Sequence, residues 1–432
     1  MEPSPKMQIF ACGENSAGWL GEPPCCVRRY VNEPHECQHN NGGKDSFYCP
    51  LWVLKPTEFF RGLYKIRVIY YENDAGFFDV DGELKHRGAD PLKQRSLAEA
   101  TRSWNINSLT GAARLADGFV FLTEDGTLLT VRDTDGVQSF SRNPIQHIAT
   151  RRVDLHNPKL VSGAVAIVLK QDPRTILSFD SWKPVCSFLE ASAPDQGPIH
   201  TATLSSPIVK LTSKFAALTE SGEVFMWGDE LPEQPPTPSD YDEDEWMDAL
   251  LEFSFCHKPI EKWPSWEPKR LDYEPQRQPL PPIKTLSTGG VNNAAVSRSG
   301  QLFLWGYKSN KWPEIEDVND HKCAEFKEAL IPNPSTPLQI KSAAAGRKHV
   351  IVLATDGSLW SAGEAVNGQL GIGLRQFGLC TEGNVIDVLE NEKDEEFAVS
   401  WERMDTEALV GLECEEVFAD GEHTLILTSS RT

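Results

Sequence analysis

The sequence lacks the long apolar segments that membranes and secretion require. No apolar run approaches the roughly 18 residues of a membrane-spanning helix, so no such helix is expected. Residues 1–14 have neither the apolar core of a signal peptide nor the arginine-rich character of a transit peptide. We therefore expect a cytoplasmic protein, with the nucleus as the alternative. In either compartment the ten cysteines are expected to be thiols rather than disulfides.

Basic residues are also scarce. The chain of 432 residues has 42 Lys and Arg against 63 Asp and Glu, a formal net charge of −21. A nucleic-acid backbone and an anionic membrane both attract basic surfaces, so neither is expected as a direct partner. The composition favours a monomer that binds another protein, and a basic surface on that protein would fit best.

The sequence motifs of common catalytic sites are missing. There is no G-x-S-x-G elbow, no phosphate-binding G-x-x-x-x-G-K-[ST], no G-x-G-x-x-G after a strand and no H-E-x-x-H. His147, His156 and His257 are isolated from other candidate catalytic residues. We therefore predict no enzymatic activity, no catalytic residue and no cofactor.

Glycine and apolar strand residues are abundant in one stretch, residues 340–373. A β-branched and aliphatic run at 349–354 is followed by Asp356-Gly357, a second run at 358–362 and a glycine-rich exit. Asp-Gly is a strong hairpin signal, because both central positions of a type I′ turn need positive φ. The stretch predicts a β-hairpin followed by a glycine loop.

Weaker copies of this hairpin recur along the chain. Their turns are at Asp81-Gly82, Asp125-Gly126, Asp172-Pro173, Ser221-Gly222 and Ser299-Gly300. The first three intervals, 44 to 49 residues, fit one four-stranded propeller blade each. Strand-like runs at 8–12 and 424–428 lack a local partner, and pairing them would complete a seventh unit. The sequence thus predicts an all-β, seven-bladed β-propeller closed by its N- and C-terminal strands, with residues 1–432 as a single domain. Closure leaves few exposed sheet edges.

Four segments interrupt this pattern as predicted insertions, at 22–63, 229–282, 308–337 and 374–407, and several of them are acidic. Residues 229–248 contain nine acidic residues and no Lys or Arg. Residues 240–253 mix acids with the apolar residues Trp246, Met247, Leu250, Leu251 and Phe253. Such acidic–hydrophobic segments can fold on a partner. The alternative is a solvated loop whose apolar residues cover a propeller edge.

The first insertion holds a cluster of potential metal ligands: Cys25, Cys26, His35, Cys37, His39 and Cys49. Thiolate and imidazole are the usual zinc ligands, but no C-x-x-C knuckle is present. A zinc site and an irregular insertion with free thiols both remain open, and no metal ligand is assigned.

The recurring pattern resembles the regulator of chromosome condensation repeat: apolar strand, Asp-Gly, apolar strand, Trp-Gly, then Gly-x-Asn-x-x-Gly-x-Leu-Gly. Its best copy is at 345–373, followed by those at 9–21, 215–228 and 293–306, and residues 419–428 match the Gly-x-x-His-Thr step. The resemblance implies a seven-bladed propeller in which His349 and His423 are buried and hydrogen-bonded. Trp227, Trp305 and Trp360 end their strands and are expected in the core.

The resemblance also implies function. A single propeller without added domains looks like the α-tubulin suppressor type. That type is an adaptor that binds a small zinc or iron protein serving diphthamide synthesis and Elongator-dependent tRNA wobble modification. The alternative is a guanine-nucleotide exchange factor for a Ran-type GTPase, as the founding family member is. The third hypothesis is that the acidic insertion itself binds a basic partner and that the propeller serves as its scaffold.

Two glycine loops and the acidic insertion supply the predicted partner contacts. Trp19 and Trp246 are the aromatic anchors, since exposed Trp is enriched at binding hot spots. The alternative for Trp19 is packing between blades. The full predicted set is Asn15, Trp19, Asp242, Glu243, Asp244, Glu245, Trp246, Asn367 and Gln369.

Overall fold

The structure is a computed structural model of the chain. It describes residues 7–13, 51–56, 65–72, 75–88, 101–102, 104–115, 117–132, 136–151, 163–190, 197–213, 215–227, 267–273, 278–289, 292–306, 327–329, 331, 338–347, 349–364, 368–372 and 398–430.

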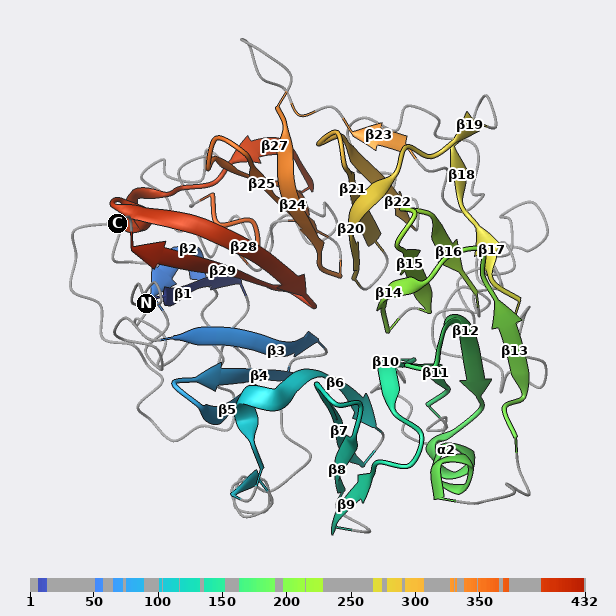
Figure 1. The fold of residues 1–432 in the computed structure, drawn as a ribbon. Helices are drawn as coiled ribbons and strands as arrows, with labels where there is room; N and C mark the ends of the chain where they lie inside the picture. The colour runs from blue at the N-terminus through green and yellow to red at the C-terminus, as the bar shows by residue number, and fades with distance from the viewer. Residues whose placement is uncertain are drawn as a thin grey trace, which may run out of the picture.

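Seven antiparallel sheets surround a central axis like the blades of a propeller (Figure 1). The first blade along the chain consists of β3 (Ile66–Glu72), β4 (Ala75–Val80) and β5 (Glu83–Gly88). The second consists of β6 (Leu109–Leu115), β7 (Gly118–Thr123), β8 (Leu128–Arg132) and β9 (Gly136–Phe140). The third consists of β10 (Ile145–Thr150), β11 (Val165–Leu169), β12 (Asp172–Phe179) and β13 (His200–Thr203). The fourth blade consists of β14 (Ile208–Leu211), β15 (Ala216–Thr219), β16 (Val224–Met226) and β17 (Lys269–Arg270). The fifth consists of β20 (Ile283–Thr288), β21 (Asn292–Ser297), β22 (Leu302–Gly306) and β23 (Lys327–Ala329). The sixth consists of β24 (Ile340–Ala345), β25 (His349–Ala354), β26 (Leu359–Glu364) and β27 (Ala398–Arg403).

The remaining blade contains both ends of the chain. Its strand order is β2 (Leu51–Pro56), β1 (Met7–Gly13), β29 (His423–Ser430) and β28 (Leu412–Asp420). β1 pairs with β29 from Met7↔Ser429 to Gly13↔His423. The predicted closure is therefore confirmed: the N-terminus supplies the third and fourth strands of a blade whose first two come from the C-terminus (Figure 1).

The hairpin turns differ from the predicted type. Only Asp81-Gly82 has positive φ at both residues, 53° and 86°. At the other Gly-containing turns only the glycine is left-handed, and its N–H bonds three residues back, as Gly357 does to the Ala354 carbonyl at 3.0 Å. This is a type I turn followed by a glycine bulge. The prediction of type I′ geometry at Asp356-Gly357 is wrong, although the hairpin itself is present.

A β-bulge occurs in the first strand of every blade, seen as a register shift against the second strand. The shifts are at Val68/Tyr70, Leu109/Gly111, Ile145/His147, Ile208/Lys210, Ile283/Thr285, Ile340/Ser342 and Cys414/Glu416. The bulged side chain often reaches the next blade: Lys284 Nζ donates to the Ile340 carbonyl at 2.8 Å, and Lys341 Nζ to the Cys414 carbonyl at 3.2 Å. Each acceptor directly precedes the next bulge. The irregularity thus connects neighbouring blades around the axis.

Apolar clusters fill the spaces between adjacent blades. One joins β7 and β11 through residues such as Val120, Ile167 and Phe179, and another joins β21 and β25 through Val296 and Val350. Helix α2 (Trp182–Glu190) packs on the former cluster through Trp182, Val185 and Leu189. Two 3-10 turns, η4 (Ile106–Ser108) and η8 (Glu407–Leu409), precede the first strands of their blades, and β18 (Asp272–Tyr273) with β19 (Gln278–Pro279) forms a small extra sheet.

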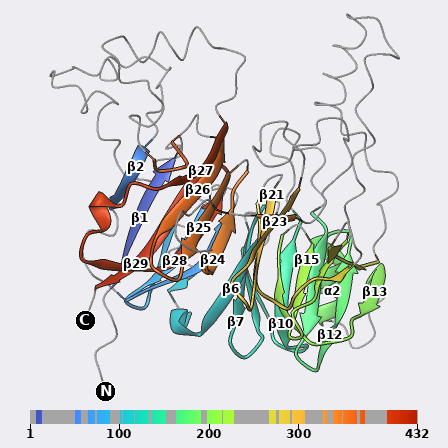
Figure 2. The same ribbon diagram turned by 90° about the horizontal axis from the view of Figure 1, so that it is seen from above.

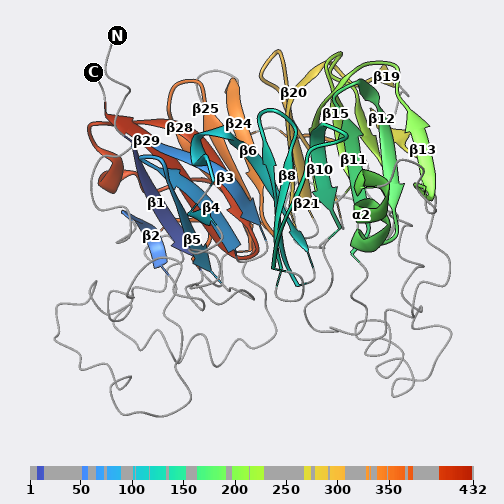
Figure 3. The same cartoon turned by 60° about the horizontal axis from the view of Figure 1, so that its bottom comes forward.

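The fourth strands of several blades lie inside the ranges predicted as insertions. They are β2, β17, β23 and β27, and their neighbours are the third strands β1, β16, β22 and β26. Because the blades share one orientation, every third-to-fourth connection leaves from the same face of the ring. The start of β1 and the end of β29 lie at the opposite face (Figures 2 and 3). We call the first of these the connection face.

Candidate functional site

Most predicted partner contacts lie outside the described residues: Asn15, Trp19, Asp242, Glu243, Asp244, Glu245, Trp246 and Asn367. The cysteine and histidine cluster at residues 25–49 is also outside them. Within the part of the chain that the structure describes, no three His, Cys, Asp or Glu side chains form a group suited to a metal ion. No helix of that part is long and apolar enough to cross a membrane.

Gln369, the remaining predicted contact, lies inside the propeller. Its side chain is fully buried. Its carbonyl accepts a hydrogen bond from Thr424 Oγ1 at 2.8 Å and a weaker one from Cys12 Sγ at 3.6 Å. The glycine loop after β26 therefore folds against the closing blade, and this stretch joins the two blades. Gln369 is accordingly left out of the proposed contact set.

His349 has the structural role that the resemblance implied. It is fully buried, and its Nε2 lies 3.1 Å from Thr424 Oγ1. Thr424 uses its one hydroxyl hydrogen on the Gln369 carbonyl, so it must accept from His349, which fixes the proton on Nε2. Burial, with His423 nearby, lowers the pKa of His349 to about 3. His423 is also buried, and neither ring is placed to act as a catalyst.

This buried histidine predicts a pH dependence of stability. In the unfolded chain His349 takes up a proton below about pH 6.5, while in the folded chain it stays neutral down to about pH 3. Stability at neutral pH is therefore lost as the pH falls through this window, by about 1.4 kcal/mol per pH unit at most. Urea unfolding at pH 7 and pH 5 should show a smaller loss for His349→Gln than for the wild type. An equal loss in both proteins would contradict this assignment.

Two of the three tryptophans predicted to end their strands in the core do so. Trp227 and Trp305 are buried. Trp305 Nε1 donates to Met226 Sδ of the neighbouring blade at 3.1 Å, and Trp227 stacks on Phe215. Trp360 is half-buried against the cluster shared by β21 and β25. The first two are core residues, as predicted. Trp360 is the second residue of β26 and only half-buried, so the prediction that it ends its strand in the core is wrong.

The segments that connect third to fourth strands carry most of the negative charge of the chain. The connections that follow β1, β16, β22 and β26 comprise residues 14–50, 227–268, 307–326 and 365–397. Together they contain 29 acidic and 10 basic residues, a net charge of −19 out of the −21 of the whole chain. The remaining residues are nearly neutral, with 34 acidic and 32 basic side chains. The acidity is thus a property of these four connecting segments rather than of the rest of the chain.

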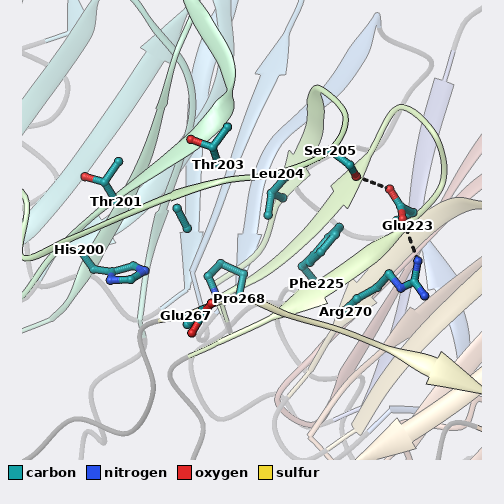
Figure 4. A pocket seen from close by; sticks show the side chains of 11 residues that line it. His200, Thr201, Thr203, Leu204, Ser205, Glu223, Phe225, Glu267, Pro268 and Arg270 are labelled. Atoms are coloured by element: carbon teal, nitrogen blue, oxygen red, sulfur yellow. Dashed lines mark hydrogen bonds and ion pairs between the residues drawn. The ribbon is translucent and has the colours of Figure 1, made fainter.

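A groove of about 520 Å³ opens between two adjacent blades, lined by β13 on one side and by β16 and β17 on the other (Figure 4). On the side of β16 and β17, the carboxylate of Glu223 lines the groove and accepts several hydrogen bonds. Ser205 Oγ donates to this carboxylate at 2.6 Å, Ser221 Oγ at 3.0 Å and Arg270 at 3.3 Å. The Ser205 bond is the main cause that holds the pKa of Glu223 below its usual value. The carboxylate therefore stays ionised at neutral pH.

Sequence reasoning missed this groove. Its lining residues come from two blades, and the short run His200–Thr203 has no turn signal or apolar pattern to single it out. Only the pairing of β13 with β12 and the closeness of the next blade bring the walls together.

Comparison with known proteins extends this picture. The RCC1 domain-containing protein RUG3, mitochondrial, from Arabidopsis thaliana is 27% identical over 156 residues, covering 36% of this chain and 29% of RUG3. The match therefore spans less than a third of that relative's length. No protein-family model matches the chain.

Solved structures resemble the fold over nearly the whole chain. Human WBSCR16 has a TM-score of 0.53 at 14% identity, covering 99% of this chain and 100% of that one. Yeast RCC1 (Prp20), in its complex with Kap60, has a TM-score of 0.58 at 12% identity, covering 99% and 90%. Prp20p from Saccharomyces cerevisiae has a TM-score of 0.52 at 13% identity, covering 100% and 93%.

A ring of seven antiparallel sheets closed by both termini makes this chain a seven-bladed β-propeller. Its fold is that of the regulator of chromosome condensation propellers, and the sequence resemblance to that repeat family is confirmed.

Proposed function

We propose that the chain is a protein-interaction propeller, without enzymatic activity, that binds a basic protein surface through its connection face. The observation that carries the proposal is that the segments leaving the strands at this face have a net charge of −19, nearly all of the −21 of the chain. An acidic surface accelerates encounter with a basic partner and selects against acidic ones. All nine predicted contacts belong to these connections. Gln369 is buried, and the other eight form the proposed contact set: Asn15, Trp19, Asp242, Glu243, Asp244, Glu245, Trp246 and Asn367.

Within this proposal the preferred identity is an adaptor of the α-tubulin suppressor type. Its partner would be a small metalloprotein that serves diphthamide synthesis and Elongator-dependent tRNA modification. Support comes from the architecture, a ring of seven blades closed by β1 and β29. The alternative is nucleotide exchange on a Ran-type GTPase. It is supported by the fold shared with Prp20p, which is described as binding Gsp1p and histones.

The compartment is part of the proposal. We propose the cytoplasm, and the mitochondrial description of RUG3 makes the mitochondrion the alternative to test. A fluorescent fusion at the C-terminus, imaged beside a mitochondrial marker, distinguishes the two locations.

Removing the acidic cluster should weaken partner binding without affecting the fold. We expect the variant Asp242→Asn, Glu243→Gln, Asp244→Asn, Glu245→Gln to bind about tenfold more weakly at low salt, and with less salt dependence, because long-range attraction is lost. Trp19→Ala with Trp246→Ala should release the partner at physiological salt as well. The measurement is affinity capture from native extract with identification of the bound proteins, followed by titration of the purified partner.

A matched control removes four charges from the opposite face. Glu83, Glu124, Asp172 and Glu220 are exposed at or beside the turns between second and third strands. Neutralising these four should leave binding unchanged. Recovery of a small metalloprotein with tRNA-modification subunits supports the adaptor, and a Ran-type GTPase released by added nucleotide supports exchange. Equal binding by the acidic-cluster variant, the tryptophan variant and the control would refute the proposed face.

A further inference from the structure

The strand β9 lies at the rim of the ring and lacks the features that protect the edges of most other outer strands (Figure 1). Its five residues, Gly136–Phe140, include no charge and no proline. By contrast, β17 and β23 are only two and three residues long and contain charged residues. β2 ends in Lys55-Pro56, and β27 ends in Glu402-Arg403. Short length, charge and proline are the means by which proteins keep a strand edge from pairing with another chain.

The pairing of β7, β8 and β9 decides which backbone groups of β9 point outward. The Thr123 N–H donates to the Thr127 carbonyl at 3.0 Å, so the backbone groups of Thr127 face β7. The direction alternates along a strand, so Thr130 faces β9, where Gln138 lies opposite it. The N–H and C=O groups of Gln138 therefore face β8, and those of Val137 and Ser139 point outward. In the part of the chain that the structure describes, no further strand pairs with β9 on this outer side.

The side chains of β9 make this edge apolar as well as uncharged. Val137 lies opposite Val131 of β8, which is buried, and is itself 49% exposed. At the other end of the strand Phe140 is buried against Trp182 of α2, with ring centroids 6.2 Å apart, which holds β9 in place. The strand β13 is also uncharged, but its exposed side chains are the polar Thr201 and Thr203. Among the described outer strands, β9 thus combines an uncharged edge with an exposed valine.

We propose that β9 pairs edge to edge with β9 of a second copy of this chain, antiparallel and about a two-fold axis at Gln138. In this register Val137 of each copy lies opposite Ser139 of the other. Both residues point their backbone groups across the interface, so each such pair exchanges two hydrogen bonds. The two-fold axis uses the same surface on both copies and closes the assembly as a dimer.

The charge of the chain favours this edge for self-association. Two copies with a net charge of −21 each repel one another, and an uncharged strand at the rim is a place where they can approach with little added repulsion. The monomer expected from the composition is then the dilute form. This contact does not rest on the proposed function, because β9 does not belong to the acidic connections.

Sedimentation velocity of the full chain over a range of concentrations tests the dimer. We expect the average mass to rise from monomer toward dimer between about 1 and 300 µM, as for other small and weak interfaces. Added salt should strengthen this association, because it screens the repulsion between the two copies. Binding of a basic partner by the connection face should weaken with salt, so the two interactions are told apart by the sign of their salt dependence.

Substitutions at Val137 separate the edge from the rest of the surface. Val137→Lys adds the kind of charge that protects other edges, and we expect at least about tenfold weaker self-association. The melting temperature should stay unchanged, because the side chain is half-exposed. Val137→Thr keeps a β-branched, uncharged residue and should associate like the wild type. Thr201→Lys adds the same charge to the uncharged outer strand of the next blade, as a matched control, and should also associate like the wild type.

A second measurement needs no variant. Amide hydrogen exchange of the wild-type chain, read at single residues at low and high concentration, should show increased protection at Val137 and Ser139. Gln138 already faces β8 and should change little. A chain that stays monomeric at high concentration and high salt, equal self-association of Val137→Lys and wild type, or unchanged exchange at both residues would each overturn the proposal. Partner binding is measured separately, so either proposal can fail while the other stands.

Discussion

Removing residues 418–432 should abolish the cooperative unfolding transition of the whole propeller. The deletion removes β29, which is hydrogen-bonded on both edges, to β28 and to β1. Its side chains at Leu425, Ile426 and Leu427 are buried in the cluster of the closing blade. Loss of these three alone costs about 5 kcal/mol or more, which approaches the total stability of a typical domain. Without β29 the N-terminal strand β1 has no inner neighbour, and the ring stays open.

Circular dichroism during heating, together with urea unfolding, measures this effect. A chain ending at Ser430 keeps all of β29 and should melt like the full-length protein. Deletion of residues 1–13 removes β1 and should be as damaging as the C-terminal deletion, because the two strands are partners in one blade. If the chain without residues 418–432 melted like the intact protein, closure by the termini would not stabilise the ring.

The hairpins could be predicted because the second and third strands of a blade are the most buried. All six residues of β25, for example, are buried, so its sequence is a continuous apolar run with a turn signal directly after it. Even the copy whose turn was predicted near Asp172-Pro173 forms a hairpin, between β11 and β12, although the turn falls before Asp172, which pairs with Leu169. In both cases the two strands and the turn are adjacent in the sequence, so the hairpin can be predicted without knowledge of the rest of the fold.

The fourth strands could not be predicted in this way. β17 is Lys269–Arg270, with both residues exposed, and β23 is Lys327–Ala329. Such strands are held by hydrogen bonds to the third strand rather than by an apolar pattern of their own. A short polar sequence of this kind cannot be told from a loop, which is why these strands fell within predicted insertions.

The position of Gln369 was unpredictable for a different reason. Its glycine-rich surroundings indicate a surface loop, yet its carbonyl bonds Thr424 and Cys12, which lie 55 and 357 positions away. Contacts between the last complete blade and the closing blade appear only once the ring has closed. The sequence could locate the loop but not the blade that covers it.

Replacing Gly346 with alanine should destabilise the protein by about 3 kcal/mol or more, the scale of a severe overpacking mutation. A Cβ atom at this position would lie 2.1 Å from His349 Cε1 and 2.4 Å from Nδ1. The imidazole cannot turn away easily, because it is fully buried and its Nε2 bonds Thr424. This contact gives a physical reason for the Gly-x-x-His spacing: the glycine leaves the space that the histidine ring fills.

A double-mutant cycle tests whether the cost of Gly346→Ala comes from the contact with the His349 ring. In a His349→Ala background the ring is gone, so adding Gly346→Ala should cost less than about 1 kcal/mol, measured by urea unfolding at pH 7. Gly111→Ala is the control, since Gly111 lies in β6 and a Cβ there would meet nothing within 4 Å, whereas Gly346 directly follows β24. It should change stability little, or raise it slightly by restricting the unfolded chain. Equal costs of Gly346→Ala with and without the ring would show that the glycine is needed for its backbone rather than for His349.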